Sequence, residues 1–495
     1  MWMLLGLCVL SAILGRLCYL IRPFDSDGSM FIYMGRLISE GGRFCHELVD
    51  NKFPSVGLIT SVPWKLFGAN WTSYVLLGGA MSFIGCAMLT RTATRHFGHH
   101  AKWPALLFAI VYFNFNFAVF GGFQLETIQA FFTILAAGAA LEWLRDRDWR
   151  DAFLLGLASG CAAMCKPTGI AVVGACLIAV AFAVRPLRWS CLRHVFASGI
   201  GFLLPAIVLF AHLLHTDTLK DMPALAHQIS AYASNSSWDP IDWTKPVTIL
   251  ILGGFPLLVR GGIFRREHDR IAMSVDRRAV TFVLVWLILE TVGVAAQRRM
   301  YAYHFLVLVP PITLLFAMLP RTVRVAPLAL SLAPTALFSI YGASLVFEIC
   351  YTGQPRSDVG AYVAAHASPG DAVWKDDAAR LWLETGCRPA SRFPMTFLFA
   401  NYDDAAIEYM PQILGDFDRT HPKYIVLPAQ RRRMIKHQTD HILELSRFAR
   451  RRENFEHAWQ QIFDYVDRGY VLETRIGNDA IYRLRTDEPA SARVE

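Results

Sequence analysis

The stretch DSDGSMFIYMGRLISEGGRFCHELVDNKFPSVGLI, from Asp25 to Ile59, places acids and a lysine directly after an apolar N-terminal segment. That segment, residues 3–21, is long enough to cross a bilayer as a helix. Charged side chains beside a membrane are costly unless they are paired or used. The stretch therefore indicates a site at a membrane surface.

The composition of the chain is that of a membrane protein. It has 495 residues, of which 54% are hydrophobic and only 18% charged, whereas soluble domains carry about 25% charged residues. The apolar residues form blocks of about 20, the length of a membrane-spanning helix. We place these blocks at residues 3–21, 71–90, 103–120, 122–143, 152–165, 169–184, 195–214, 246–263, 279–296, 304–319 and 325–347. The sequence therefore predicts an α-helical polytopic membrane protein with about eleven transmembrane helices.

The positive charge of the chain follows its topology. The net charge is +8, but the basic residues lie in short connections between the apolar blocks, so we exclude a nucleic-acid-binding protein. The Arg-rich connections all fall on one side if the blocks alternate, and the positive-inside rule assigns that side to the cytoplasm. The first loop, residues 22–70, and the region 348–495 then lie on the outer side.

The region 348–495 differs in composition from the rest of the chain. Acids and bases mix there, and the apolar runs shorten. The segments DAVWK, KYIVL, YVLETRI and AIYRL have the pattern of strands, and DHILELSRFARRRENFEHAWQQIFDYV has that of a helix. We predict a small α/β domain outside the membrane. Most of the ten cysteines lie in apolar blocks, and a Cys350–Cys387 bridge is left open.

The acids of the first loop have two interpretations. Asp25 and Asp27 lie close to the outer end of the first span, where a carboxylate can act as a general base towards a hydroxyl. The alternative is a solvated loop acid or a helix N-cap. The following FIYMGRLISEGG has apolar residues at spacings of three and four, so we expect a short amphipathic helix that ends at Gly41 and can lie along the membrane surface.

The lysine of the first loop follows in the segment VDNKFP. Lys52 beside a bilayer is well placed to meet a lipid phosphate. The alternative is an ordinary lysine whose stem covers apolar surface while its ammonium reaches water.

These residues resemble the first outer loop of GT-C glycosyltransferases. The shared pattern is D-x-D, then F-x-Y, a helix ending in Gly, and D-x-K-x-P. The resemblance is to the bacterial dolichyl-phosphate-mannose-protein mannosyltransferase-like family and to the lipid A aminoarabinose transferases. Many members have D-x-K-P-P and a second acid after the D-x-D. This chain has Phe53 and Gly28 at those positions, which affects inferences about the substrate more than the family.

Three further stretches resemble the same family. GGFQLETIQAFFTILAAGAALEWL places Glu126 near the outer end of a span, GLASGCAAMCKPTG places Lys166 at the outer surface, and QRRMYAYHFLVLVPPITLL opens a late span. Gly156 and Gly160 stand four residues apart, which predicts a close helix contact. The segment YVAAHASPGDAVWKDDAARLWLETGCRPASRF resembles the small outer domain of bacterial members.

The resemblance implies two domains: a GT-C transmembrane catalytic domain over residues 1–347, whose first outer loop 22–70 carries juxtamembrane helices, and an extracytoplasmic α/β domain over residues 348–495. It further implies an inverting transferase in the bacterial inner membrane, which moves a sugar from a polyprenyl-phosphate donor to a hydroxyl of a glycan, lipid or protein.

The resemblance also implies roles for particular side chains. We expect Asp27 to be the base, with Asp25 second. The residues expected to bind the donor phosphate are Lys52, Lys166, Arg298 and Arg299. Those expected to line the donor or acceptor cavity are Asp50, Glu126, Tyr303 and His304, with Asp50 orienting Lys52. No cofactor is expected, but a divalent ion at the two first-loop acids is left open, because some GT-C enzymes use one.

The cationic candidates also have structural interpretations. Lys166 can be a cation that the dipole favours at a helix C-terminus. Arg298 and Arg299 can be a basic pair flanking a span, although we place them on the outer side, against the positive-inside trend.

Three other functions compete with the lipid-donor transferase. A transporter or flippase of lipid-linked sugars would show internal repeats and charges along a membrane path, and Glu290 is the main acid inside a span. A membrane scaffold would leave the first-loop acids and lysine unexplained. An O-antigen ligase-like transferase would carry a longer late outer loop than residues 297–303.

Overall fold

The computed structural model describes most of the chain, in two compact units. The described residues are 2–21, 26–113, 123–183, 190–234, 277–297, 302–318, 337, 340, 357–376, 378–400, 402–430 and 449–485. Unit 1 comprises Met1–Phe24, Asn70–His212 and Trp238–Thr352, and unit 2 comprises Asp25–Ala69, Leu213–Ser237 and Gly353–Glu495.

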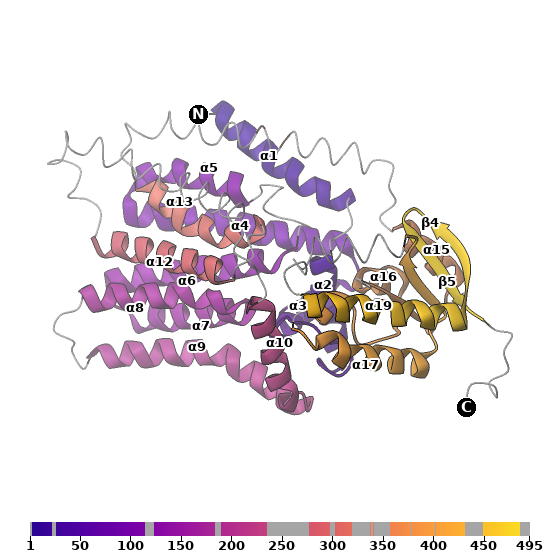
Figure 1. Cartoon of the computed structure of the whole chain (residues 1–495). Coiled ribbons are helices and arrows are strands. Elements are labelled where there is room, and N and C mark those ends of the chain that lie inside the picture. Colours follow the sequence, from indigo (N-terminus) through magenta and orange to yellow (C-terminus); the bar gives the residue numbers. More distant parts are fainter. Residues whose placement is uncertain are drawn as a thin grey trace. The chain divides into compact units, whose positions relative to one another are not determined.

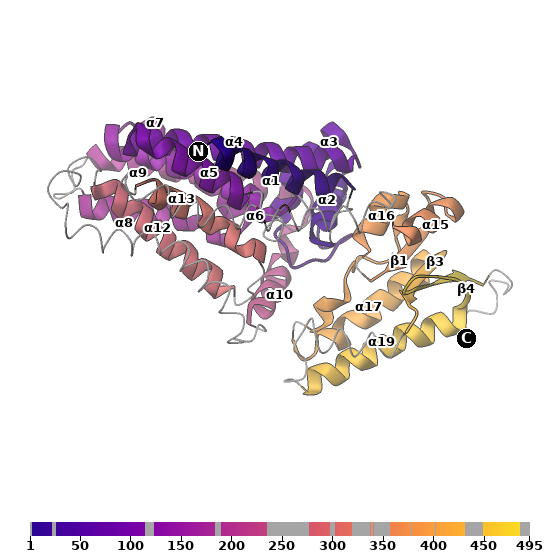
Figure 2. The ribbon, with the colours of Figure 1, turned by 90° about the horizontal axis from the view of Figure 1, so that it is seen from above.

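Unit 1 is a set of helices that run alongside one another (Figures 1 and 2). They are α1 Trp2–Ile21, α4 Trp71–Phe97, α5 Lys102–Phe113, α6 Leu125–Asp146, α7 Trp149–Cys165, α8 Ala171–Ala183, α9 Ser190–His215, α12 Arg277–Ala296 and α13 Val309–Ala317, with short 3-10 turns η1 His99–Ala101, η2 Pro167–Ile170 and η5 Ala302–Leu308. Each of these α-helices overlaps a predicted apolar block, so the helical prediction is confirmed for the part of unit 1 that is described.

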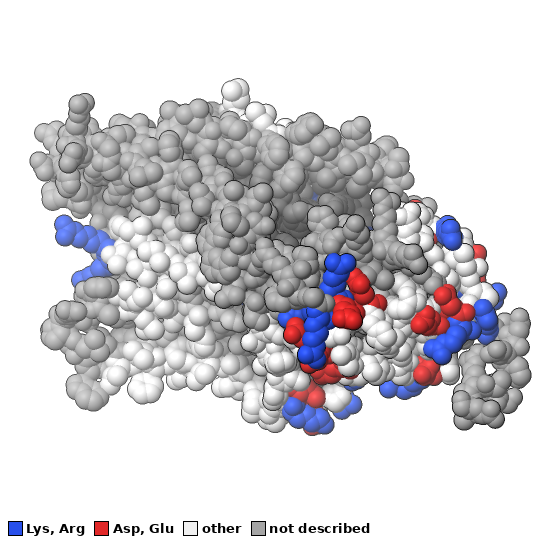
Figure 3. Space-filling model, viewed as in Figure 1, with Lys and Arg blue, Asp and Glu red and all other residues white. Residues whose placement is uncertain are grey.

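Four helices within the described ranges are long and apolar enough to cross a membrane. They span Trp71–Phe97, Leu125–Asp146, Leu192–His215 and Arg277–Ala296. Only 17% of the most apolar stretch of α9 lies inside the structure, and Figure 3 shows a white surface without charged side chains over most of this helix. Such a surface fits contact with lipid. The blocks 246–263 and 325–347 lie wholly or almost wholly outside the described residues, so the count of eleven spans stays a prediction.

Glycines bring α7 and α9 into close contact. A Cβ atom on Gly156 would lie 1.9 Å from the carbonyl oxygen of Ser198, and one on Gly160 would lie 2.6 Å from that of Phe202. Gly201 of α9 approaches Phe153 in the same way, at 2.3 Å. Any larger residue would push the backbones apart. The predicted close helix contact at Gly156 and Gly160 is therefore confirmed.

Unit 2 contains a five-stranded sheet with the order β2-β1-β3-β5-β4. The strands are β1 Ala372–Lys375, β2 Arg388–Pro389, β3 Tyr424–Pro428, β4 Tyr470–Ile476 and β5 Asp479–Leu484. β1 pairs in parallel with β2 and β3, whereas β5 runs antiparallel to both β3 and β4. The four predicted strands are confirmed. The two-residue β2 was not predicted, because so short a strand has no periodicity.

Helices complete unit 2. They are α2 Ser26–Ser39, α3 Pro54–Phe67, α10 Met222–Ser234, α15 Asp358–His366, α16 Ala379–Thr385, α17 Ala405–Thr420 and α19 Ala449–Gly469, with 3-10 turns η3 Leu219–Asp221 and η7 Thr396–Ala400. Aromatic residues of β1, α17 and α19 form one core, in which Trp374 contacts Phe417 and Trp459. The predicted C-terminal helix is confirmed as α19, and the first part of its predicted range, 440–448, lies outside the described residues.

The first outer loop folds as a helical pair, α2 and α3, within unit 2. Gly35 permits the contact, because a Cβ atom there would lie 2.5 Å from the carbonyl oxygen of Thr60. On the other side, Tyr33 lies 4.9 Å from the ring of Trp382 in α16. All five residues from Met30 to Met34 are buried, and five successive residues cover every face of a helix. The predicted short helix is confirmed as α2, but its turn from Met30 to Met34 has no exposed face, and α3 and α16 pack against this helix.

The division into units groups the first outer loop with the C-terminal α/β region. The predicted domain limits, 1–347 and 348–495, stay a prediction. Cys387 is a free, buried cysteine whose thiol lies 3.5 Å from the carbonyl oxygen of Ser368, and Cys350 lies outside the described residues.

Candidate functional site

The predicted site residues fall into two clusters, one in each unit. We call Asp27, Asp50, Asn51 and Lys52 of unit 2 the loop cluster. We call Glu126, Lys166, Gln297 and His304 of unit 1 the helix-end cluster. Asp25, Arg298 and Arg299 lie outside the described residues, so their predicted roles stay predictions.

The loop cluster brings the D-x-D and D-x-K-x-P motifs together. Asp27 lies in the first turn of α2, and Lys52 lies two residues before the start of α3. The ammonium nitrogen of Lys52 lies 3.6 Å from Oδ1 of Asp27 and donates a hydrogen bond of 3.1 Å to Oδ1 of Asn51. Both side chains of the ion pair are partly exposed, at 22% for Lys52 and 28% for Asp27. Solvent therefore reaches both members of the pair.

The start of α3 fixes the position of Lys52. Phe53 is the N-cap residue in an extended conformation, and Pro54 occupies the first helical position, where its fixed φ favours helix initiation. Upstream, the N–H of Val49 donates a hydrogen bond of 2.7 Å to the carbonyl oxygen of Arg392. The segment between these two points is held at both ends, so the side chain of Lys52 starts from a defined backbone.

Asp50 supports the same turn from inside the protein. Its side chain is only 2% exposed, and its Oδ1 accepts a 2.6 Å hydrogen bond from the N–H of Asn51. In the described part of the chain its Oδ2 has no hydrogen-bond partner. Burial raises the pKa of the Asp50 carboxyl, and the charge of Lys52 opposes that shift. Asn51 thus links Asp50 to Lys52, and the orienting role of Asp50 stays a prediction.

The helix-end cluster joins the ends of several helices of unit 1. Glu126 lies in the first turn of α6 and is 2% exposed. It forms an ion pair with Lys166, the C-cap residue of α7. Lys166 also donates a 3.1 Å hydrogen bond to Oε1 of Gln297, just after α12. Nε2 of His304 lies 3.6 Å from the same carboxylate oxygen of Glu126.

Neighbouring residues brace this cluster. The rings of Tyr303 and His304 meet edge to face at 4.7 Å, and Nε2 of Gln129 donates a 2.9 Å hydrogen bond to Oγ1 of Thr168. The structure thus brings together four predicted residues, namely Glu126, Lys166, Tyr303 and His304. Lys166 was expected to emerge at the surface, but its side chain is only 20% exposed, because Glu126 and Gln297 engage it.

Two residues of these clusters were not predicted. Asn51 stands inside the D-x-K motif and Gln297 opens the QRRM stretch, so position within a motif was the available signal. Among the described residues, no group of three His, Cys, Asp or Glu side chains is arranged to hold a metal ion. Asp25 is not described, so a divalent ion at the first-loop acids stays an open prediction.

Comparison with known proteins bears on the predicted family. A family model described as dolichyl-phosphate-mannose-protein mannosyltransferase matches residues 51–215. The crystal structure of ArnT from Cupriavidus metallidurans bound to undecaprenyl phosphate matches with a TM-score of 0.61 and 14% identity, over 98% of both chains. The predicted GT-C resemblance is confirmed. At this identity, the similarity to the solved structure shows the fold.

Further solved structures are similar in fold. ArnT from the same organism in the apo state matches with a TM-score of 0.59 and 15% identity, over 97% of both chains. The oligosaccharyltransferase AglB from Archaeoglobus fulgidus, in complex with an inhibitory peptide and a dolichol-phosphate, matches with a TM-score of 0.51 and 12% identity. That match covers 99% of this chain and 75% of AglB. A comparison with the sequences of curated proteins gave no match.

Proposed function

We propose that this GT-C protein is a membrane glycosyltransferase that moves a sugar from a polyprenyl-phosphate donor to an acceptor hydroxyl, with inversion at the anomeric carbon. The observation that carries the proposal is the 3.6 Å ion pair between Asp27 and Lys52. It places a carboxylate that can accept a proton beside a cation that can meet a phosphate, which are the two groups that this transfer requires.

In the proposed reaction, the carboxylate of Asp27 takes the proton of the acceptor hydroxyl, with Asp25 as the second candidate. The hydroxyl oxygen forms a bond to the anomeric carbon. The bond between that carbon and the phosphate oxygen breaks, and polyprenyl phosphate leaves with the electron pair. Attack opposite to the leaving group inverts the configuration of the anomeric carbon.

The departing phosphate gains negative charge, which a nearby cation stabilises. We assign this role first to Lys52, because its side chain is partly exposed and lies beside the proposed base, Asp27. Lys166, Arg298 and Arg299 are the further candidates. Lys166 already forms an ion pair with Glu126. In the proposal, it can bind the phosphate only when this ion pair weakens. Asp50, Glu126, Tyr303 and His304 remain the residues that we predict for the donor or acceptor cavity.

Two structures of similar fold support a lipid-phosphate donor, since the ArnT structure contains undecaprenyl phosphate and the AglB structure is a complex with a dolichol-phosphate. The proposed acceptor is a hydroxyl of a glycan, a lipid or a protein. We place the reaction on the outer side of a bacterial inner membrane, where the loop 22–70 and the region 348–495 are predicted to lie.

The experiment measures the release of free polyprenyl phosphate. Purified full-length protein is incubated with a panel of polyprenyl-phosphate sugars and an envelope acceptor fraction, beside Asp27→Asn and a control, Asp418→Asn. Asp418 is an exposed acid of α17. We expect release by the wild type and the control, and none by Asp27→Asn. Full activity of Asp27→Asn would transfer the base role to Asp25 or Asp50.

A transporter or flippase of lipid-linked sugars is the second candidate, and Glu290 favours it. This acid is fully buried in α12, accepts a 3.1 Å hydrogen bond from Nε1 of Trp286, and has no partner for its Oε2 within the described ranges. Acids inside spans often mark transport paths. No phosphate release with any donor, together with flipping of the lipid in liposomes, would select this function.

A further inference from the structure

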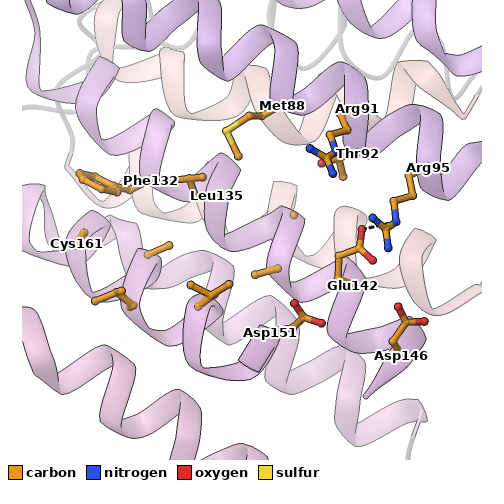
Figure 4. Close-up of a pocket in the computed structure, with 15 residues that line it drawn as sticks. Met88, Arg91, Thr92, Arg95, Phe132, Leu135, Glu142, Asp146, Asp151 and Cys161 are labelled. Carbon is orange, nitrogen blue, oxygen red and sulfur yellow. Dashed lines mark ion pairs between the residues drawn. The ribbon is translucent and has the colours of Figure 1, made fainter. Parts of the chain in front are cut away.

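A groove lies between α4, α6 and α7 of unit 1, apart from the helix-end cluster of the same unit (Figure 4). Its volume is about 620 Å³, within the range of roughly 300–1,000 Å³ that small-molecule sites occupy. The charged side chains of the groove come from the C-terminal part of α4, the C-terminal end of α6 and the first turn of α7. That is the opposite end of α6 and α7 from Glu126 and Lys166.

The groove is polar at one end and apolar along the rest. Figure 4 shows Met88, Phe132, Leu135 and Cys161 towards one side and the charged side chains towards the other. The charged residues of the lining are Arg91, Arg95, Glu142, Asp146 and Asp151. This gradient matches a molecule with a hydrocarbon chain and an ionic head, whereas a sugar or nucleotide would require polar groups along the whole length.

Most of these charges are already paired with one another. Arg95 lies 2.8 Å from Glu142, and Arg145, beside the groove, lies 2.8 Å from Glu142 and 2.5 Å from Asp146. Two lining residues make no ion pair in the described part of the chain, Arg91 of α4 and Asp151 of α7. The polar end thus offers one unmatched cation and one unmatched anion, from different helices.

We infer that this groove binds a zwitterionic phospholipid with a primary ammonium, phosphatidylethanolamine, with its phosphate at Arg91, its ammonium at Asp151 and part of one acyl chain between α4 and α7. Arg can hold a phosphate through two parallel hydrogen bonds, and a primary ammonium donates to a carboxylate. Phosphatidylglycerol would leave Asp151 unmatched, and the trimethylammonium of phosphatidylcholine has no N–H to donate.

The setting suits a lipid headgroup. Trp149, in the first turn of α7, is 46% exposed, and Trp residues are enriched at the level of the headgroups. The charged end of the groove includes residues of RTATRHFGHHAK and RDRDWR, the segments that the sequence assigns to the cytoplasmic side. This inference is independent of the proposed transferase activity.

The test is a lipid titration of the full-length protein in mild detergent, read by native mass spectrometry. The probes are the palmitoyl-oleoyl forms of phosphatidylethanolamine, phosphatidylcholine and phosphatidylglycerol. We expect phosphatidylethanolamine to bind about tenfold more tightly than the other two, since the loss of one charge contact costs about that factor in the dissociation constant. Equal binding of the three lipids by the wild type would overturn the inference.

Variants assign the contacts. We expect Asp151→Asn to lower the affinity for phosphatidylethanolamine to that for phosphatidylcholine, and Arg91→Gln to weaken all three lipids. Arg193→Gln and Asp418→Asn remove an exposed charge outside the groove and should change nothing. If Asp151→Asn keeps the preference for phosphatidylethanolamine, the inference is wrong.

A variant that fills the groove tests the inference even if the charge variants do not fold. Ala158 of α7 lines the groove, and Ala158→Phe places a ring in the space assigned to the acyl chain without changing any charge. We expect it to abolish the selective binding of phosphatidylethanolamine while the protein elutes as a single species in size-exclusion chromatography. Unchanged selective binding by this folded variant would place the lipid elsewhere on the protein.

Discussion

Lys166 and Glu126 form an ion pair that joins the C-terminal end of α7 to the first turn of α6. The carboxylate is 2% exposed and the lysine 20%. A buried pair is not a strong source of stability, because each charge loses its hydration, but removing one partner leaves the other buried and uncompensated. This asymmetry makes the pair testable.

We predict that Lys166→Met destabilises the protein more than Glu126→Gln, because the methionine variant leaves a buried carboxylate whose remaining ion-pair partner among the described residues is His304, at 3.6 Å. Breaking a fully buried pair costs roughly 3–5 kcal/mol, and the partial exposure of Lys166 favours the lower end. The free energy of unfolding in mixed micelles of a mild detergent and SDS measures the effect.

The double variant is the control for this pair. Glu126→Gln with Lys166→Met removes both charges, so it should be more stable than Lys166→Met alone. If instead the two single losses simply add in the double variant, the ion pair does not hold these helix ends together.

The close contact of α7 and α9 gives a second prediction. Gly156→Ala places a methyl group 1.9 Å from the carbonyl oxygen of Ser198, so the two backbones must separate. Overpacking of this kind costs about 1–3 kcal/mol, and the same unfolding measurement reports it. Gly199→Ala in α9 is the matched control, because nothing lies within 4 Å of its Cβ position. That change should be neutral or stabilising, since alanine favours helices. Equal losses for both would contradict the contact.

Local patterns allowed much of the fold to be predicted. The apolar blocks became α1, α4 to α9, α12 and α13, and four alternating segments became β1, β3, β4 and β5, because burial in a membrane or a sheet imposes its period directly on the sequence. The close helix contact at Gly156 and Gly160 could be predicted for a similar reason. The spacing of the two glycines indicates a contact without identifying the partner helix.

Contacts between distant segments were not predictable in this way. Lys166 bonds to residues 40 and 131 positions away, and no local pattern selects such partners. The burial of this turn of α2 could have been predicted from its composition, but the spacing of apolar residues over 31–42 favoured a helix with one polar face. Met30 to Met34 are all apolar or aromatic, and a helix that is apolar all round is a buried one.

Asp50 gives a prediction about pH. Burial raises the pKa of its carboxyl, so the folded state holds a proton more tightly than the unfolded state. The cost of burying the charge therefore appears as the pH rises above the unfolded pKa and levels off above the folded pKa. We expect Asp50→Asn to gain thermal stability relative to the wild type as the pH rises above the ordinary pKa of an aspartate, and to lose activity because Lys52 is less well oriented.

The control for Asp50→Asn is Asp418→Asn, which removes an exposed charge. Its apparent midpoint of thermal unfolding should follow that of the wild type at every pH. A difference between Asp50→Asn and the wild type that stays constant over the whole pH range would show that the carboxyl of Asp50 does not titrate differently on folding.

Lys52 gives the prediction that bears most directly on the reaction. Lys52→Met should lower kcat/KM for the polyprenyl-phosphate donor by roughly 10–100-fold, the effect of losing one charge-assisted hydrogen bond of about 1.5–3 kcal/mol. Lys52→Arg should lie between the wild type and Lys52→Met, because the charge remains while the geometry changes. Lys65→Met removes an exposed lysine from the last turn of α3 and should leave kcat/KM unchanged. The assay is steady-state release of polyprenyl phosphate at varied donor concentration. If Lys52→Met and Lys65→Met give the same kinetics, the donor phosphate does not depend on Lys52, and Lys166 becomes the next cation to test.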